Sequence, residues 1–243
     1  MDLTTLLALN AVLALAAFFS ALAGFGFALI ATPFLVLFLP PQQVVPAVIL
    51  CWLPLAVALV WSCRKEASIR RYGRLLIGGV LGLPIGVYIL AHADAAILRT
   101  GIGALTLLAT LSIFLKPARP LPREQWLTGG VGFISGILGG ASSISGPVVV
   151  LFGLNQGWHP RGMRADLLHY FLGSYLAALL MFRKVGVLDV QAVQLGSVAI
   201  PGIVAGYFAG TRLKDYLSPL FFRRLALSAI TISGLAALLA DWC

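Results

Sequence analysis

Charged residues are scarce in this chain of 243 residues, at 10% of the total, and acidic residues are scarcest, with eight Asp and Glu. Hydrophobic residues make up 60%, and the mean hydropathy is +1.00. Soluble globular domains carry about 25% charged residues, so this composition excludes them. Polar links between the apolar runs are short, as at 64–74, 116–124 and 183–189. We therefore predict an all-α polytopic membrane protein with a single transmembrane domain over residues 1–243.

Cysteine is also rare, and Cys51, Cys63 and Cys243 are too scattered for a disulfide framework or a zinc site. The eight acidic residues lie near the ends of apolar runs, which excludes a carboxylate pair at mid-membrane for acid–base catalysis or cation coupling. Phosphate-binding, dinucleotide-binding and metal-ligand motifs are absent from the sequence. We predict no catalytic residue, no metal and no cofactor. The N-terminal run lacks the basic start of a secretory signal, so we expect it to remain as a membrane segment.

Basic residues outnumber acidic ones, which gives a net charge of +9. They lie in short loops between apolar runs, without interleaved aromatic residues, so a nucleic-acid-binding module is not expected. Orientation of the chain in the membrane explains this charge better. The partners that we predict are the lipid bilayer and a small anion.

Two stretches of the sequence match when they are shifted by 114 residues: "FSALAGFGFALIATPFLVLF" (19–38) and "FISGILGGASSISGPVVVLF" (133–152). The shift aligns the glycine and proline positions Gly26 with Gly140 and Pro33 with Pro147. We infer a duplication, with repeat 1 at about 3–115 and repeat 2 at about 126–241. Each repeat begins with an uncertain segment, 3–39 or 126–154. Three plain membrane spans follow each one: 44–63, 72–91 and 96–115, then 164–182, 190–211 and 221–240.

The distribution of basic residues indicates how residues 126–154 are folded. If this segment turns back as a hairpin, 14 of the 17 basic residues lie on the inner side of the membrane. If it crosses once, 10 basic residues lie on the inner side and 7 on the outer side. The hairpin satisfies the positive-inside rule better. Each repeat then consists of a broken or re-entrant helical hairpin and three transmembrane helices, so the two repeats are inverted relative to each other, and both termini face outward.

The turns of these hairpins are candidates for a binding site. Each arm of 126–154 has about 13 residues, or about 20 Å of helix, against a hydrocarbon core of about 30 Å, so the turn "GGASSIS" lies deep in the membrane. The turn "AGFGF" at 23–27 approaches it from the other side. Unwound backbone at this depth requires a protein-lined or water-filled cavity. Helices that restart there direct their N-terminal amides at the cavity, which attracts an anion.

Hydroxyl donors and glycines at the two turns make up the predicted binding set, because glycine allows close approach to the backbone. The set comprises Gly24, Gly26 and Thr32 in the first half and Gly139, Gly140, Ser142, Ser143, Ser145 and Gly146 in the second. Close helix packing is the alternative role of small residues in membranes. We prefer that role for a second group of glycines, at 78, 79, 82, 86, 202, 206 and 210.

His169 lies about two turns into the segment that starts near Met163, and Asp166 lies on the same helical face. Two hypotheses remain open: a gating or proton-linked role for this pair, and a histidine that is satisfied by a neighbouring helix. Ser142 and His169 also allow the alternative of an intramembrane hydrolase. Ser143 occupies the position where a serine-nucleophile motif has glycine, so we predict that the protein is not an enzyme.

The paired segments "GFGFALIATPFLVLF" and "GFISGILGGASSISGPVVVLF" resemble the duplicated signature of the sulfite exporter TauE/SafE family. The stretch "MRADLLHYFLGSYLAALLMFRKVGVLD" resembles the region that follows the second copy. This resemblance implies a permease of the bacterial inner membrane that exports sulfite, organosulfonates such as sulfoacetate, or related small anions. Many members have more glycines where this chain has Ser142 and Ser143. The expected mechanism is alternating access around the midplane site, and the alternative is a passive anion channel.

Overall fold

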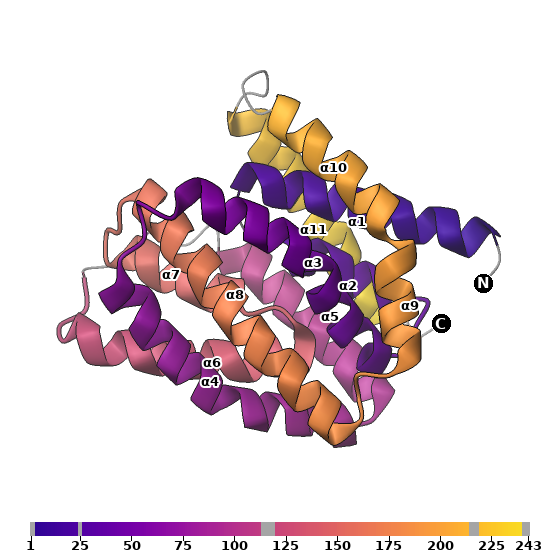
Figure 1. The fold of residues 1–243 in the computed structure, drawn as a ribbon, viewed down its shortest axis with the longest axis horizontal. Coiled ribbons are helices and arrows are strands. Elements are labelled where there is room, and N and C mark those ends of the chain that lie inside the picture. The colour runs from indigo at the N-terminus through magenta and orange to yellow at the C-terminus, as the bar shows by residue number, and fades with distance from the viewer. Residues whose placement is uncertain (1–2, 24–25, 113–119, 214–218, 240–243) are drawn as a thin grey trace.

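The computed structural model describes residues 3–23, 26–112, 120–213 and 219–239. All regular secondary structure in these ranges is helical (Figure 1). The helices are α1 (Leu3–Ala23), α2 (Phe27–Leu35), α3 (Pro41–Cys63), α4 (Ile69–His92), α5 (Ala95–Ser112), α6 (Glu124–Ser142), α7 (Gly146–Asn155), α8 (Pro160–Val185), α9 (Val190–Val198), α10 (Ile200–Leu213) and α11 (Pro219–Leu239). The all-α fold class is confirmed.

Four helices, α3, α4, α5 and α8, are long and apolar enough to cross a membrane, and they correspond to four of the predicted spans. A fifth span is formed if α9 and α10 are taken together. We predicted one continuous helix at 190–211, whereas the chain bends by 45° between these two helices. Pro201 follows the break and has no backbone N–H to continue the helical hydrogen bonding, which explains the bend.

The segments 3–39 and 126–154 are both interrupted. In the first, Gly26 precedes α2 with a φ of 98°, a left-handed conformation that glycine adopts without strain. In the second, Ser143 ends α6 with a φ of 60°, and α7 starts at Gly146. Residues 126–154 therefore do not form one straight helix. Glycine and serine at these positions mark the breaks in the sequence.

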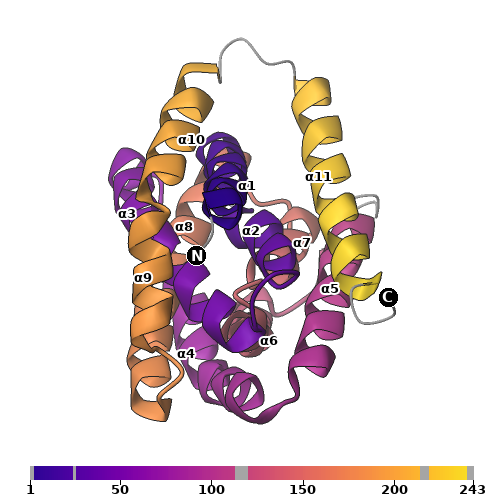
Figure 2. The same ribbon diagram turned by 90° about the vertical axis from the view of Figure 1, so that its right-hand side faces the viewer.

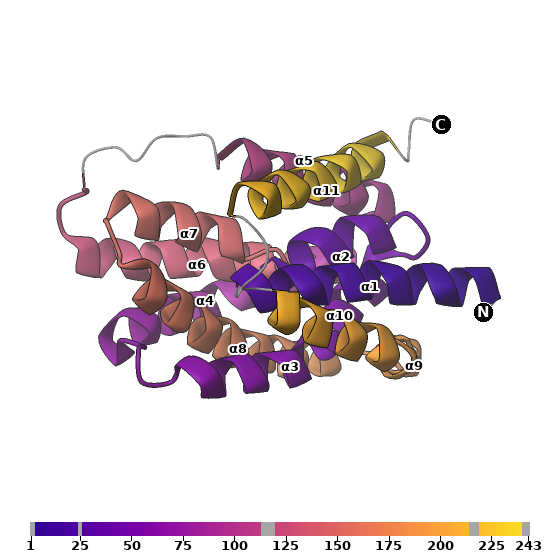
Figure 3. The same cartoon turned by 90° about the horizontal axis from the view of Figure 1, so that it is seen from above.

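Hydrogen bonds show that α6 and α7 form a hairpin. The side-chain amide of Gln156, just after α7, accepts from the Leu121 amide at 2.7 Å and donates to the Leu121 carbonyl at 3.1 Å. The indole of Trp158 donates to Glu124, the first residue of α6, at 2.7 Å. The beginning of α6 and the end of α7 thus lie together. Figure 3 shows that α1 and α6 run inward from opposite ends of the molecule, and that α2 and α7 lie next to them.

Two helix pairs pack at backbone contact distance through glycine. Along α4, each of three glycines lies against a backbone carbonyl of α6, and a Cβ at any of them would overlap it: Gly78 on Gly129, Gly82 on Phe133 and Gly86 on Ile137. Along α10, Gly202 and Gly206 contact the carbonyls of Asn10 and Ala14 of α1 in the same way. The packing role of these five glycines is confirmed. Residue numbers rise together in both pairs, so α4 is parallel to α6 and α1 is parallel to α10.

The loops gather at two ends of the bundle. At one end, hydrogen bonds join Ser68 to Asp166 and Arg74 to Gln125. We call this the basic end, because it carries Arg64, Lys65, Arg70, Arg71, Arg74, Arg123, Arg161 and Arg164. At the other end, Gln42 bonds to Ala93 and Arg99 bonds to Val36. Arg183 and Lys184 lie at the far end of α8 from Arg164. This separation agrees with the charge asymmetry that the sequence predicts.

The two hairpins occupy the middle of the bundle. Figure 2 shows α2 and α7 near its centre, with α9 and α10 on one side, α4 below, and α5 and α11 on the other side. The outer helices expose apolar side chains, for example Ile77, Leu81 and Tyr88 on the face of α4 that is turned away from α6. Lipid solvates such a surface, whereas water would not. Other helices therefore surround α2 and α7, whereas α1 and α6 also expose apolar side chains such as Leu7 and Ile134.

Candidate functional site

The turn between α6 and α7 is held by its own serines. The Ser142 hydroxyl donates to the Leu138 carbonyl at 2.7 Å and accepts from the Ile144 amide at 3.2 Å. The Ser143 amide closes the helix end on the Gly139 carbonyl at 2.9 Å. All three serines of the turn are buried. This short stretch is therefore an ordered structure in the interior of the protein.

One hydrogen bond joins the two hairpins. The hydroxyls of Thr32 in α2 and Ser143 lie 2.7 Å apart, and both side chains are fully buried. Thr32 precedes Pro33, and Ser143 lies four positions before Pro147, the matching proline of the second half. The sequence predicted that these two polar groups face a common site. The structure brings them into direct contact.

Tyrosines of α8 support the turn from behind. The Tyr175 hydroxyl donates to the Ser143 carbonyl at 2.6 Å and lies 2.9 Å from the Ser145 hydroxyl. The Tyr170 hydroxyl donates to Ser135 of α6 at 2.8 Å, and Ser135 donates to the Ser145 carbonyl at 2.7 Å. Buried polar groups that are all hydrogen-bonded fix a unique arrangement. The position of the turn is thus set by α6 and α8 together.

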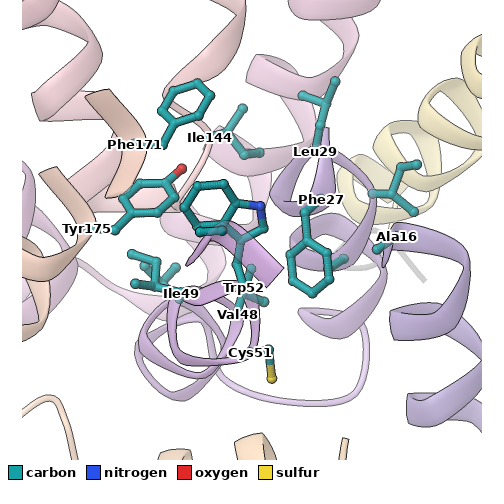
Figure 4. Close-up of a cluster of buried hydrophobic side chains, with 14 of the residues drawn as sticks. Ala16, Phe27, Leu29, Val48, Ile49, Cys51, Trp52, Ile144, Phe171 and Tyr175 are labelled. Atoms are coloured by element: carbon teal, nitrogen blue, oxygen red, sulfur yellow. The ribbon is translucent and has the colours of Figure 1, made fainter. Parts of the chain in front are cut away.

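A pocket of about 30 Å³ lies between the two hairpin turns. Residues from the start of α2, from α3, from the α6–α7 turn and from α8 line it: Gly26, Phe27, Ala28, Leu29, Val48, Trp52, Ser143, Ile144, Ser145, Gly146, Pro147, Phe171 and Tyr175. Figure 4 shows Trp52 between Phe27 and Tyr175, with Phe171 and Ile144 close by. The Trp52 ring meets Tyr175 edge-on at 5.4 Å between centroids. Every described residue of the lining is uncharged.

Two helix N-termini border this pocket. α2 begins at Phe27 and α7 at Gly146, and both residues belong to the lining. The first N–H groups of a helix have no acceptor within the helix, and the helix dipole places partial positive charge there. Pro147 has no N–H, so Gly146 and Val148 provide the free amides of the first turn of α7. An apolar pocket with these donors at its wall suits a small anion.

The structure places some residues of the predicted binding set at the pocket and others away from it. Gly26, Ser143, Ser145 and Gly146 line the pocket, and Thr32 is bonded to Ser143. Three other members do not belong to the lining: Ser142, whose hydroxyl points back to α6, Gly139, which lies against Ser145, and Gly140, which packs on the backbone of α4. Gly24 lies outside the described residues.

Sequence reasoning missed the aromatic part of the lining. Trp52, Phe171 and Tyr175 come from two plain spans, and they contact each other at the pocket. Phe171 and Tyr175 are four positions apart and therefore share a face of α8. This spacing was the available sequence signal for an aromatic face at the pocket, but in an apolar helix it is equally compatible with packing against a neighbouring helix.

Asp166 and His169 lie near the basic end, where α8 packs on α4. Asp166 is fully buried; it accepts from the Ser68 amide at 2.6 Å and lies 2.9 Å from Nε of Arg71. The His169 ring stacks on Tyr72 of α4, with 5.0 Å between centroids, and its Nδ1 lies 2.8 Å from the Ala165 carbonyl. These contacts connect α8 to α4. A gating or proton-linked role of the pair stays a prediction.

The hydrolase alternative requires a hydrogen bond between a serine nucleophile and its base. The Ser142 hydroxyl donates to the Leu138 carbonyl, and Nδ1 of His169 lies at hydrogen-bond distance from the Ala165 carbonyl. Within the described ranges, no hydrogen bond joins Ser142 to His169. The geometry therefore does not favour that alternative.

Replacing Asp166 by alanine is expected to lower the thermal stability of the folded protein strongly. The change leaves the Ser68 amide without its acceptor and Arg71 without its counter-charge, and removing one partner of a buried ion pair costs about 3 kcal/mol. Asp189→Ala is the matched control, because this exposed N-cap of α9 contributes about 1 kcal/mol. Melting curves of the purified variants provide the comparison. Equal shifts for both variants would contradict a structural role of the Asp166 contacts.

Comparison with known proteins adds to this geometry. A family model described as "Sulfite exporter TauE/SafE" matches residues 9–237, which is nearly the whole chain and includes both hairpins. The chain belongs to the TauE/SafE family. The resemblance in the paired signatures is thereby confirmed, as is a multi-pass, membrane-embedded protein of a transport family.

A curated relative from Cupriavidus necator carries the name "Probable sulfite/organosulfonate exporter TauE". The chain is 28% identical to this relative over 246 aligned positions, which cover 98% of the chain and 95% of the relative. The two proteins therefore correspond along their full lengths. No solved structure matches the chain.

Proposed function

We propose that this TauE/SafE member is a secondary transporter that exports small sulfur-containing anions, sulfite or organosulfonates such as sulfoacetate, across the bacterial inner membrane. The family and the name of the Cupriavidus necator relative support export of this substrate class. The structural observation that carries the proposal is the buried hydrogen bond between Thr32 and Ser143, beside a pocket to which both hairpin turns contribute.

The proposed mechanism is alternating access by two inverted repeats. Its support is the reciprocal packing of the halves: α4 of the first half runs parallel to α6 of the second, and α10 of the second runs parallel to α1 of the first. α6 begins at the basic end, whereas α1 runs toward that end, so the corresponding first helices of the two halves point in opposite directions. Rocking of one half against the other exposes a site between them to each side in turn. With the basic end inside, both termini face the periplasm.

The anion binds between the turns in this proposal. Amides at the start of α7 and α2 and the hydroxyls of Ser143 and Ser145 serve as donors. These hydroxyls are bonded to Thr32 and Tyr175 in the present structure, and the pocket is small. Binding therefore requires the two turns to separate, and the anion then takes the place of the Thr32–Ser143 bond. This exchange couples occupancy of the site to movement of one hairpin relative to the other.

Transport in proteoliposomes tests the proposal. Purified protein should take up labelled sulfite or sulfoacetate with saturation, and an internal pool of the same anion should drive counterflow. Flux that rises linearly with concentration and shows no counterflow would indicate the passive channel instead. If neither anion moves faster than in protein-free liposomes, the proposed function is wrong. Sulfate and taurine serve as comparison solutes in the same assay.

Thermal stabilisation provides an independent check on binding. A ligand that binds only the folded protein raises its stability by about 2.7 kcal/mol at a hundred times its dissociation constant. We expect sulfite or sulfoacetate to raise the melting temperature of the purified protein and taurine, which has no net charge at neutral pH, to leave it unchanged. Equal shifts with all of these solutes would contradict a specific anion site.

A further inference from the structure

Arg164 is a half-buried arginine in the first turns of α8, near the basic end. One of its terminal nitrogens donates to the Ala21 carbonyl in the last turn of α1, at 3.3 Å. Its Nε is buried and has no hydrogen-bond partner within the described part of the chain. A buried donor without an acceptor is unfavourable, so its presence in a folded protein calls for an explanation.

Within the described part of the chain, Arg164 forms no ion pair. The ion pair in the described ranges is that between Arg71 and Asp166, and Asp166 uses its other oxygen for the Ser68 amide. Asp166 thus faces Arg71 and Ser68, although its Oδ2 also has no hydrogen-bond partner within the described ranges. An arginine near the end of a membrane-spanning helix commonly reaches toward the membrane surface, whereas the Nε of Arg164 is buried inside the protein.

A structural role explains only part of this arrangement. The last carbonyls of α1 have no partner within the helix, and a cation at a helix C-terminus is favourable, so Arg164 caps α1 through the Ala21 carbonyl. The cap employs one terminal nitrogen of the guanidinium. It leaves the Nε–H without an acceptor.

Arg164 lies on the same helix, α8, as two residues that line the pocket. Phe171 and Tyr175 follow it by seven and eleven positions, so the three side chains share one face of α8, with about 10 Å along the helix axis between Arg164 and Phe171. Phe171 and Tyr175 both line the pocket. The contact with Ala21 places the guanidinium next to the end of α1 that leads into the turn at Gly26. Arg164 therefore lies between the basic end and the pocket along α8.

We propose that Arg164 binds the oxyanion group of the substrate, a sulfonate or sulfite, on its way from the basic end to the pocket between the hairpin turns. This inference rests on the proposed function. The planar guanidinium offers Nε–H together with a terminal N–H, a pair of parallel donors that matches two oxygens of one anionic group. The described residues of the pocket lining include no cation, so Arg164 provides the charge that draws the anion into the protein. In the first half, Val45 stands at the corresponding position, four residues after the start of α3.

Three variants in the proteoliposome assay test the role of Arg164. Arg164→Gln removes the charge but keeps an amide donor for Ala21, Arg164→Lys keeps the charge, and Arg161→Gln is a matched control at an exposed arginine one turn earlier. We expect Arg164→Gln to raise KM for sulfoacetate about tenfold at similar maximal flux, as loss of a charge-assisted hydrogen bond implies. Arg164→Lys should recover most of the affinity, and Arg161→Gln should match the wild type.

The outcomes separate this inference from the proposed function. Saturable wild-type flux together with an unchanged KM in Arg164→Gln would overturn the role of Arg164 alone, as would a fall in melting temperature without a change in KM. Absence of wild-type flux would overturn the proposed function first. If Arg164→Gln does not fold, labelling of the wild-type protein with phenylglyoxal decides. Sulfoacetate should slow modification of Arg164 and not of Arg161, and equal labelling with and without sulfoacetate would contradict the proposal.

Discussion

Replacing Ser145 by leucine should abolish transport while the protein still folds into the membrane. The Ser145 side chain is buried, it lines the pocket, and its hydroxyl lies 2.9 Å from that of Tyr175. A leucine in this place fills the space between the turn and the tyrosine ring and removes a donor from the anion site. Misplacement of binding groups by about 1 Å can lower a rate about 100-fold, so we expect flux at the limit of detection. Overpacking of this kind costs about 1–3 kcal/mol, which lowers the melting temperature without preventing folding.

Ser142→Ala is the control for this prediction. Ser142 is adjacent in sequence to the lining residues, but its hydroxyl bonds back to Leu138 and does not face the pocket. The change removes the bonds to Leu138 and Ile144 and should lower the melting temperature, but we expect saturable transport to persist, which would also leave the hydrolase alternative without a nucleophile. Initial rates of sulfoacetate counterflow provide the measurement. Wild-type flux through Ser145→Leu would exclude the pocket between the hairpins as the transport site.

Replacing Gly82 by leucine should prevent formation of the folded protein. Its Cα packs on the Phe133 carbonyl of α6, and a Cβ there would overlap that backbone atom, which cannot move without displacing the whole helix. The contacts of Gly78 and Gly86 on the same stripe would be lost together with it. Effects beyond about 4–5 kcal/mol arise from this kind of core overpacking, and a marginally stable protein does not survive them.

Gly73→Leu is the matched control, because Gly73 lies on the same helix and a Cβ there meets nothing within 4 Å. Both variants should be expressed as fluorescent fusions and compared by size-exclusion chromatography in mild detergent. We expect a single symmetrical peak for Gly73→Leu and aggregate or no protein for Gly82→Leu. A normal peak and normal transport for Gly82→Leu would show that α4 and α6 do not pack as the structure has them.

Local signals in the sequence predicted where the helices are interrupted and where two helices pack closely. Glycine at position 26 and the serines after Gly140 interrupt apolar runs, and the chain is interrupted at both places. The small residues at Gly82 and Gly206 predicted close packing, because only glycine permits backbone contact between helices. Such signals depend on a few neighbouring residues, so they can be read from the sequence without knowledge of the rest of the fold.

The aromatic wall of the pocket was not predictable in this way. Trp52 and Tyr175 come from spans in which most residues are apolar, and an aromatic ring that faces a pocket has the same sequence environment as one that faces lipid. The choice between neighbouring serines was also not predictable. The left-handed conformation of Ser143 turns its side chain toward Thr32, whereas Ser142 remains helical and points back to α6. The two neighbouring serines thus differ both in backbone conformation and in the partner of the hydroxyl.

The central claim is that a small sulfur-containing anion is held between the two hairpin turns. The most direct measurement is an experimental structure of the protein with bromoethanesulfonate, in which anomalous scattering locates the bromine. The account predicts the sulfonate at the amides of Gly146 and Val148, with the bromine directed toward Trp52 and Phe171. A bromine signal elsewhere in the protein, with the Thr32–Ser143 bond intact, would contradict it.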